Sequence, residues 1–372
     1  MKKQVAAWFL CVFGLMAFLP LFQHSFHPFK LAGLQGAFDK GTPPVLHLAN
    51  WFNGNFQQHA DIYLKNNTGF NGELVRLRNQ ADYSLFGNIN TNLTLGRENY
   101  IFDPNYIYAR EGTDVLPDSV LLQNSLSLQQ SKLLLDSLQI PLLFCFAPNK
   151  ANFYPEFLPT VSPASEITNQ TFFKNIFLKN NVWVIDFDSW FVELKKTSKY
   201  PLIPKYGAHW STYGAAIAGD SLLKTIGKLT HKDLVLFDIR RITTDEKPRF
   251  TDDDYLASLN LMKKWKSPEM AYPEIGFTKG VKPNVLIISD SFIWNFYDLG
   301  IIQNCFSEKS SVWYYNKTAF DFQKNNLGPL SENLKKEDIL NRDAVILIAT
   351  GPSLKDFGYN FFEQLNTAFL HE

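Results

Sequence analysis

A serine at the end of an apolar run is the first residue of this sequence that could perform covalent chemistry. The segment NVLIISDSFIWNF, residues 284–296, passes from apolar residues into Ser289, Asp290 and Ser291 and then returns to aromatic residues. Ser291 follows a predicted strand, so its hydroxyl is expected at the carboxyl end of a sheet, where sites in α/β folds lie. Backbone N–H groups of the next turn could stabilise an oxyanion. The same pattern also suits a plain strand-to-helix turn, capped by Ser289 or Asp290.

A nucleophilic hydroxyl needs a general base, and His209 is the histidine best placed for that role. It lies in KYGAHWSTYGAA, directly before a predicted helix and beside Trp210. A helix N-terminus disfavours the imidazolium form, which keeps the ring neutral and able to accept a proton. The remaining histidines lie near the membrane segment, in the N-terminal helical region, in a charged loop and at the terminus: His24, His27, His47, His59, His231 and His371. Packing of a partly buried His209 on Trp210 is the alternative interpretation.

Two further predicted strands end in polar residues. Asn149 and Lys150 follow FCFAP, where Asn149 could donate to an oxyanion and Lys150 could hold an anionic sugar. A solvated turn after Pro148 explains the same residues without a site. Asp186 follows the strand NVWVI, and its carboxylate could orient the histidine or cap a helix.

The fold class follows from the arrangement of the apolar strands. Continuous rather than alternating apolar runs, separated by helices, indicate a mostly parallel sheet covered on both faces, the doubly wound α/β pattern. The strands are expected in IPLLFCFAP, NVWVIDF, NVLIISD, SSVWYYN and DAVILIATG. Residues 228–280 interrupt this alternation and are interpreted as a charged, turn-rich insertion over one edge of the sheet. The acidic run TDDDY within it is expected to be solvated surface.

Composition excludes several classes of function. The chain has 372 residues, with 36 basic and 36 acidic side chains, so no basic field suggests a nucleic-acid partner. Three cysteines do not make a disulfide framework, and no Cys/His spacing suggests a metal site. Neither a metal nor an organic cofactor is therefore expected.

The N-terminus predicts a membrane anchor. Two lysines precede an uncharged stretch from Val5 to Phe22, close to the shortest length that spans a bilayer, roughly 17–25 residues. The lysines favour a cytoplasmic N-terminal end. Because no clear cleavage site follows, an uncleaved signal anchor is favoured over a removed signal peptide. The predicted location is the bacterial inner membrane, with one span and the bulk of the chain in the periplasm.

The predicted domain organisation has three parts. Residues 1–24 are the cytoplasmic tip and anchor, and residues 25–112 are a stalk with an N-terminal helical segment. Residues 113–372 are the α/β domain, which carries the insertion at about 228–280.

Five segments together carry a resemblance to a known family. LIISDSF resembles the GDSF block of SGNH-type hydrolases, and GAHWSTYGA resembles the D-T-H-W-x-x-x-G block of the alginate O-acetyltransferase family, the AlgJ/AlgX type. In the same order as in that family, ELVRLRNQADYSLFG resembles its N-terminal helix, LGRENYIF its GKDGWLF turn, and FAPNKANFYPEFLP its PPK…YPE segment. The resemblance spans roughly residues 70–360.

The resemblance implies a membrane-anchored periplasmic domain with an SGNH hydrolase-like, flavodoxin-like fold. Such a domain transfers acetyl groups to polysaccharide hydroxyls, and a multi-span membrane O-acyltransferase is the partner that supplies the acetyl group. Carried over by motif, Ser291 is the nucleophile and His209 the base. Asn149, Lys150, Asp290 and Trp210 are candidate substrate or oxyanion residues.

Two positions depart from the family motifs. The glycine of GDSF falls on Ser289, which can still form a turn. The aspartate two residues before the histidine falls on Gly207, so the group that usually orients the imidazole is missing. In serine proteases the loss of that control costs about ten-thousand-fold in rate. Asp186 is the preferred substitute, ahead of a backbone carbonyl, Asp188 or Asp290. The alternative is a non-catalytic subunit that binds glycan or supports a membrane O-acyltransferase.

Overall fold

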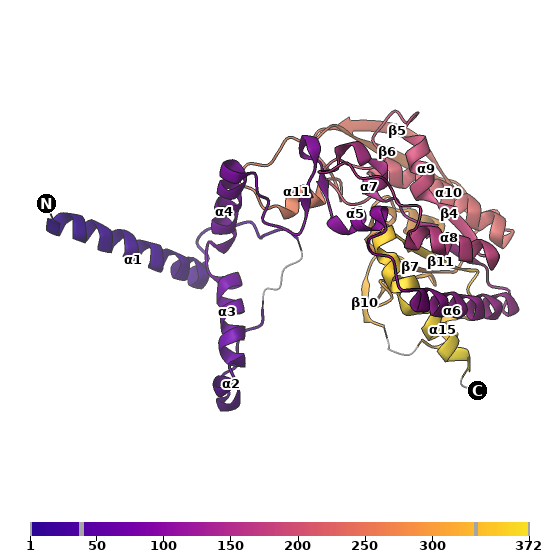
Figure 1. Ribbon diagram of the computed structural model, residues 1–372, viewed down its shortest axis with the longest axis horizontal. Coiled ribbons are helices and arrows are strands. Elements are labelled where there is room, and N and C mark those ends of the chain that lie inside the picture. Colours follow the sequence, from indigo (N-terminus) through magenta and orange to yellow (C-terminus); the bar gives the residue numbers. More distant parts are fainter. Residues whose placement is uncertain (1, 37–40, 331–333, 371–372) are drawn as a thin grey trace. The chain divides into compact units, whose positions relative to one another are not determined.

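The computed structural model describes residues 2–36, 41–330 and 334–370 (Figure 1). Met1 of the predicted anchor, residues 37–40 of the predicted stalk and His371 lie outside these ranges. The chain forms two compact units. The N-terminal unit runs to Thr91 and also includes Leu256–Trp265 from the predicted insertion, and the α/β unit holds the other residues.

The N-terminal unit is built from helices. They are α1 (Lys2–Phe26), α2 (Leu48–Phe52), α3 (Asn55–Asn67) and α4 (Asn71–Phe86). Gln4–Phe26 within α1 is long and apolar enough to cross a membrane, a property that anchors and signal sequences share. The C-terminal end of α1 packs where α3 meets α4, since His24 Nδ1 lies 2.8 Å from the Asn67 carbonyl oxygen. The Phe29 and Phe70 rings also pack together, with centroids 5.9 Å apart.

A seven-stranded sheet forms the centre of the α/β unit. Its order is β10-β9-β8-β7-β11-β3-β4, and the five strands from β8 to β4 are parallel. Their bounds are β3 (Leu142–Phe146), β4 (Trp183–Asp186), β7 (Val285–Ser289), β8 (Ser311–Tyr314) and β11 (Ala344–Ala349). The antiparallel strands β9 (Thr318–Asp321) and β10 (Asn326–Pro329) extend the β8 edge. The mostly parallel sheet predicted from the continuous apolar runs is confirmed.

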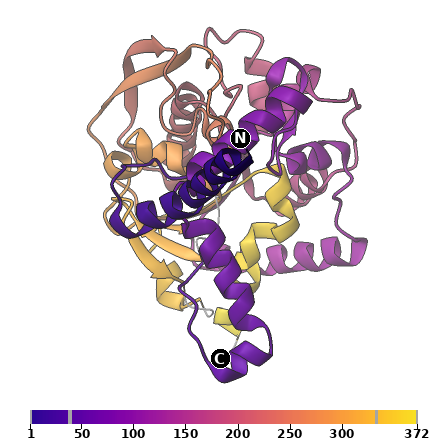
Figure 2. The same cartoon turned by 90° about the vertical axis from the view of Figure 1, so that its left-hand side faces the viewer.

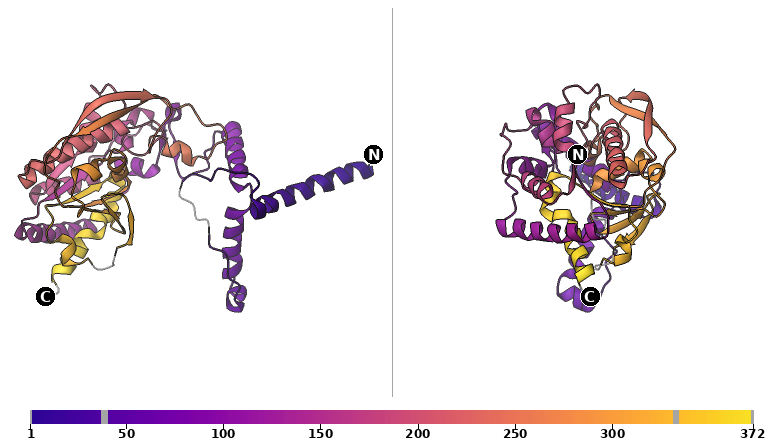
Figure 3. Two further views of the ribbon diagram at one scale, coloured as in Figure 1. Left: turned by 180° about the vertical axis from the view of Figure 1, so that it is seen from behind. Right: turned by 90° about the vertical axis from the view of Figure 1, so that its right-hand side faces the viewer.

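Helices cover both faces of this sheet, as Figures 1 and 3 show. Successive strand residues point to opposite faces, so Val285 and Ile287 join one core cluster while Leu286 and Ile288 join the other. The first cluster receives α9 (Phe187–Leu194), α10 (Thr212–Thr230), α12 (Trp294–Asp298) and α13 (Ile301–Cys305). The second receives α6 (Asp118–Ser137), α8 (Asn169–Lys179) and α15 (Phe361–Leu370). This two-sided burial explains why the central strands β3 and β11 are apolar at every position and β7 at all but its last.

Short elements complete the α/β unit. They are β1 (Thr94–Leu95), β2 (Ile101–Phe102), α5 (Pro104–Glu111), α7 (Lys150–Phe153) and α14 (Lys336–Ile339), with 3₁₀ turns at Arg97–Asn99, Pro155–Phe157, Ser291–Ile293 and Gly351–Asn360. β1 and β2 pair as a small antiparallel ladder.

The predicted insertion contains a pair of long antiparallel strands with one irregularity in their register, between Ile239 and Arg241. β5 (Phe237–Asp245) and β6 (Met270–Phe277) pair antiparallel, and α11 (Asp254–Ser258) lies in the connection between them. β5 has only a weak strand signal in the sequence because its central residues, DIRRI, are mostly charged and exposed. β6 begins buried at Met270, Ala271 and Tyr272, so only one of the two strands has a strong apolar signal.

Candidate active site

Ser291 lies at the carboxyl end of a central strand, as the sequence predicts. β7 ends at Ser289, and Asp290 caps the 3₁₀ turn Ser291–Ile293 by accepting from the Phe292 N–H at 3.1 Å. Ser291 is therefore the first residue of the turn, and its own N–H has no carbonyl one turn earlier to donate to. That N–H is the nucleophile's own backbone donor and lies close to the Tyr315 phenol oxygen, whereas the Phe292 N–H donates to the Asp290 cap.

His209 meets Ser291 directly. The distance from His209 Nε2 to Ser291 Oγ is 2.7 Å, within the reach of general-base catalysis. The His209 side chain is 8% exposed, and its ring packs edge-on against Phe292, with centroids 4.9 Å apart. Ser211, the N-cap of α10, holds the start of that helix by accepting from the Gly214 N–H at 2.9 Å. The imidazole is thus fixed between a helix start and the nucleophile's own turn.

The carboxylate beside His209 belongs to Asp254, from the acidic run TDDDY. Asp254 Oδ2 lies 2.9 Å from His209 Nδ1, and Oδ1 accepts from the Ala208 N–H at 2.8 Å. The ring N–H of His209 does not point directly at Oδ2, so the contact has the distance but not the alignment of a hydrogen bond. The interpretation of TDDDY as solvated surface was wrong, since Asp252 is also only 3% exposed.

Gly207 has no space for the aspartate that the family motif places there. A Cβ at this position would lie 2.5 Å from the Thr251 carbonyl oxygen and 2.6 Å from Pro204 Cγ. It would also lie 3.0 Å from the Asp252 carbonyl oxygen. The loop that carries Asp254 therefore occupies the volume that a side chain at 207 would need. The carboxylate reaches the imidazole from this loop instead of from the residue two positions before the histidine.

Side-chain hydrogen bonds hold the loop against the site. The Thr212 hydroxyl lies 3.4 Å from Asp252 Oδ2, and the Asn295 side-chain amide donates to Thr251 Oγ1 at 3.0 Å. Thr212 is the first residue of α10, and Asn295 lies in α12 after the nucleophile's turn. Burial raises the pKa of Asp252 to about 7, opposed by hydrogen bonds from Tyr272 and Thr212.

Lys150 lies behind the histidine loop and does not face solvent. It is 1% exposed, and its Nζ donates to the carbonyl oxygens of Lys205 at 2.8 Å and Gly207 at 2.7 Å. Burial lowers the pKa of Lys150 to about 7, and the nearby Asp254 carboxylate opposes that shift. The prediction that Lys150 contacts an anionic sugar does not fit this buried position. Lys150 instead fixes the backbone that leads to His209.

Asn149 is the N-cap of α7. Its side-chain oxygen accepts from the Ala151 N–H at 2.8 Å, and its amide donates to the Tyr106 carbonyl at 3.0 Å. Its backbone N–H donates to Asp188 at 2.7 Å. Asn149 is 1% exposed, so these contacts tie the end of β3 to its neighbours.

Asp186 and Asp290, the other two predicted carboxylates, bind elsewhere. Asp186 caps α9 through the Ser189 N–H at 2.9 Å and pairs with Lys174 at 2.6 Å. The structure places it away from the imidazole nitrogen that Asp254 contacts. Asp290 is 1% exposed and accepts from the Thr350 N–H at 3.0 Å, which links the ends of β7 and β11. Burial raises the pKa of Asp290.

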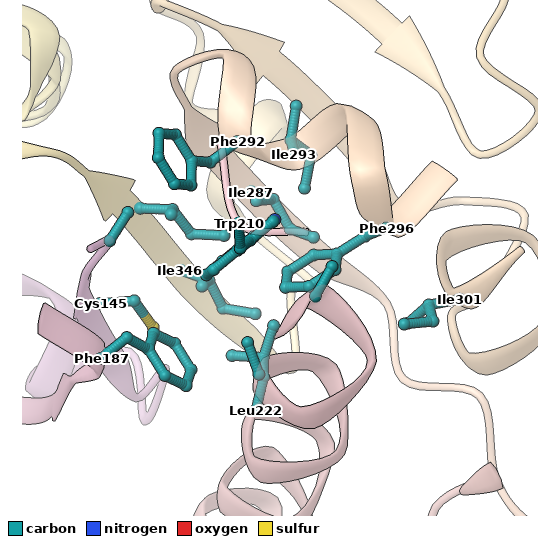
Figure 4. Close-up of a cluster of buried hydrophobic side chains, with 14 of the residues drawn as sticks. Cys145, Phe187, Trp210, Leu222, Ile287, Phe292, Ile293, Phe296, Ile301 and Ile346 are labelled. Atoms are coloured by element: carbon teal, nitrogen blue, oxygen red, sulfur yellow. The ribbon is translucent and has the colours of Figure 1, made fainter. Parts of the chain in front are cut away.

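Trp210 is a core residue. Its side chain is fully buried among Phe187, Phe292 and Phe296, as Figure 4 shows. Trp210 is therefore not available for the predicted contact with substrate. It packs instead on Phe292 in the nucleophile's turn, and Phe292 in turn contacts the His209 ring.

Tyr315 is a residue near the nucleophile that the sequence analysis missed. Its phenol oxygen lies close to the hydroxyl and the backbone N–H of Ser291, which favour the phenolate, but burial is the larger influence and raises the pKa of Tyr315 well above its usual range. Tyr315 and Asn316 both have left-handed backbones, with φ of 51° and 53°. Such conformations are costly for residues other than glycine and are often found at functional sites. The run SVWYYN shows two tyrosines after a strand but gives no sign that the second bends back toward Ser291.

No protein-family model and no curated protein matches this chain. The chain is similar in structure to the O-acetyltransferase domain of Pseudomonas putida AlgJ. That match has a TM-score of 0.46 and 15% identity, and it covers 74% of this chain and 99% of that one.

Two further solved structures are also similar. Pseudomonas aeruginosa AlgX matches with a TM-score of 0.47 and 12% identity, over 77% of this chain and 71% of AlgX. Bacillus cereus PatB1 matches with a TM-score of 0.40 and 13% identity, over 65% of this chain and 92% of PatB1. The AlgJ/AlgX type is the one that the sequence motifs resemble. Likenesses at these scores assign no activity, so we infer the function from this chain's own residues.

Within the described ranges, no group of three or more His, Cys, Asp or Glu side chains is arranged to hold a metal ion.

Proposed function

We propose that this chain is a membrane-anchored O-acetyltransferase that moves acetyl groups onto glycan hydroxyls in the bacterial periplasm. The observation that carries the proposal is the array of Ser291, His209 and Asp254. Oγ lies 2.7 Å from Nε2, and Nδ1 lies 2.9 Å from the carboxylate. A nucleophile, a base and an orienting acid in this order make up the acyl-transfer triad.

In the first step His209 Nε2 accepts the proton of Ser291 as Oγ bonds to the acetyl carbonyl carbon. The Ser291 N–H, which lies beside the Tyr315 phenol oxygen in the free site, is the proposed donor to the developing oxyanion. The bond from the carbonyl carbon to the leaving group then breaks, and His209 returns its proton to that group. Asp254 stabilises the imidazolium that exists between these events.

In the second step a glycan hydroxyl replaces the leaving group. His209 accepts the proton of that hydroxyl as its oxygen attacks the acetyl-serine carbonyl. The bond from Ser291 Oγ to the acetyl carbon breaks, and Oγ takes the proton back. Water in place of the glycan gives ester hydrolysis, so the same residues serve a transferase or an esterase.

The geometry of the triad supports acyl transfer in general. The resemblance of five sequence segments to the AlgJ/AlgX type is the basis for proposing an acetyl group, a glycan acceptor and a membrane donor partner. A multi-span membrane O-acyltransferase is the proposed acetyl donor. The apolar helix α1 supports attachment to the inner membrane.

The non-catalytic alternative depends on the missing aspartate at position 207. The Asp254 carboxylate lies beside His209 Nδ1, where that aspartate would act. The glycine at position 207 is therefore no longer a reason to favour a non-catalytic subunit.

The test is acyl trapping on the full chain in detergent. The protein is mixed with p-nitrophenyl acetate, quenched in acid, digested and examined by mass spectrometry. We expect one acetyl group on the peptide that contains Ser291, and Ser291→Ala should lower turnover by on the order of 10⁴-fold or more. Turnover unchanged by Ser291→Ala, or acetyl on another residue alone, would contradict the proposal. Adding oligosaccharide acceptors then separates transfer from hydrolysis by the ratio of acetylated glycan to acetate.

A further inference from the structure

One segment of the N-terminal unit exposes large apolar side chains and has no Asp, Glu, Lys or Arg among them. From Gly41 to Ala60 the sequence contains no Asp, Glu, Lys or Arg. The helices α2 and α3 in this region bury none of their residues. Five large apolar side chains in and beside α2 have exposed fractions of 49% or more: Val45 65%, Leu46 64%, Leu48 80%, Trp51 49% and Phe52 83%. Soluble surfaces seldom gather so many large apolar side chains without a partner.

The segment lies in the same unit as the apolar helix α1. The last turn of α1 is held where α3 meets α4, through His24 and the Asn67 carbonyl and through the paired rings of Phe29 and Phe70. Figures 1 and 2 show α3 running crosswise to α1, with α2 at its far end. If α1 spans a bilayer, α3 runs along the membrane surface beside the end of α1, and α2 lies at the same level.

The residue types fit the boundary between headgroups and acyl chains. Trp and other amphipathic aromatic residues favour this depth, where apolar rings are buried and polar groups stay hydrated. The Trp51 and Phe56 rings pack together at 5.6 Å, with Asn50, Asn53 and Asn55 close by in the sequence. A protein partner is less well matched, because a helix of five residues cannot present the i, i+3, i+4, i+7 ridge that a helix-binding groove reads.

We propose that α2 and its flanks, residues 43–56, form a second membrane contact, inserted in the outer boundary of the bilayer that α1 spans. Two contacts on one unit fix its rotation about the axis of α1, which a single spanning helix leaves free. Because the segment has no Lys or Arg, burial of apolar surface drives the insertion. The contact is therefore insensitive to anionic lipid and to salt.

The test uses the full chain with Cys11→Ser, reconstituted in phosphatidylcholine vesicles. The two remaining cysteines, Cys145 and Cys305, are fully buried, so a single new cysteine can be labelled with an environment-sensitive fluorophore. Phe52→Cys places the label in the proposed contact. Lys65→Cys on α3 is the matched control, since the Lys65 side chain is 71% exposed and paired with Asp61.

We expect the label at position 52 to be blue-shifted and quenched several-fold more by spin-labelled acyl chains than the label at 65. Aqueous iodide should quench the label at 65 more strongly. Neither result should change when a third of the lipid is anionic. Equal iodide quenching at both positions would overturn the proposal, as would insertion that occurs only with anionic lipid. Neither outcome bears on the acyl-transfer proposal, since Phe52 and Lys65 lie outside the triad.

Discussion

The site joins two regions that are built in different ways, the turn after β7 and the loop from Arg249 to Asp254. The turn continues a buried central strand, and the Asp290 cap links it to β11. The loop belongs to an insertion and combines its own turn hydrogen bonds, such as Asp252 N–H to the Arg249 carbonyl, with side-chain contacts to other elements, such as Thr251 with Asn295. The nucleophile therefore has a position set by the sheet, whereas the acid has a position set by tertiary contacts. The acid should be the easier of the two to displace.

The largest effect that distinguishes the two regions is expected from Asp254→Asn. The amide cannot stabilise the imidazolium, so kcat should fall by about 10³-fold while Ser291 remains in place. Asp186→Asn is the matched control, because Asp186 caps α9 and pairs with Lys174, and it should change kcat less than about three-fold. Steady-state hydrolysis of p-nitrophenyl acetate measures both. Equal losses in the two variants would mean that the carboxylate at 254 has no special role.

A second prediction concerns the space at position 207. Gly207→Ala places a Cβ 2.5 Å from the Thr251 carbonyl oxygen, which should push the loop outward. We expect a loss of about 1–3 kcal/mol in the free energy of unfolding, with reduced kcat. Gly207→Asp should not restore activity to Asp254→Asn, since the loop occupies the same volume. Restored activity in that double variant would show that the loop moves freely from the site.

Lys150→Met tests the support behind His209. It removes both hydrogen bonds to the carbonyls of Lys205 and Gly207, so the loop should loosen and kcat should fall by about ten-fold, with little change in KM. Lys199→Met is the control. Lys199 is exposed and lies in the connection between α9 and α10 that also contains Lys205 and Gly207, and the variant should behave as wild type. A rise in KM with kcat unchanged would indicate that Lys150 binds substrate, as the sequence alone suggested.

The smallest effect is a change in pH dependence. Burial raises the pKa of Asp252 from its ordinary value of 3.8 to about 7, so the folded protein binds this proton more tightly than the unfolded chain. The contribution of Asp252 to stability is therefore present below about pH 4 and is lost as pH rises towards 7. Asp252→Asn should remove this slope, which urea unfolding at pH 5 and pH 7.5 would measure. A slope that persists in the variant would assign the proton to another group.

The parallel sheet and the positions of Ser291 and His209 could be predicted because each leaves a local signal. The continuous apolar run Val285–Ile288 in β7 indicates burial on both faces, and a serine just beyond such a strand lies at its carboxyl end. Ser211 three residues before Gly214 marks the start of α10, which places His209 just outside the helix. The hydropathy of α1 is local in the same sense.

Asp254 and Tyr315 could not be found in this way. TDDDY has the composition of a solvated acidic run, and no sequence feature distinguishes the buried Asp252 from the aspartates beside it. Tyr315 reaches Ser291 through a left-handed backbone that its residue type does not favour. The position of Asp186 after a strand suits an orienting carboxylate and a helix cap equally well in the sequence, and the structure shows the cap.

By itself, the sequence determined the class of sheet, the apolar N-terminal helix, and a serine and a histidine at the ends of two elements, because periodicity and capping act over a few residues. Tertiary structure decided which carboxylate meets the imidazole. That choice depends on the volume left open at Gly207 and on contacts from α10, α12 and β6 to one loop. Those contacts join residues far apart in the chain, and only the packed fold brings them together.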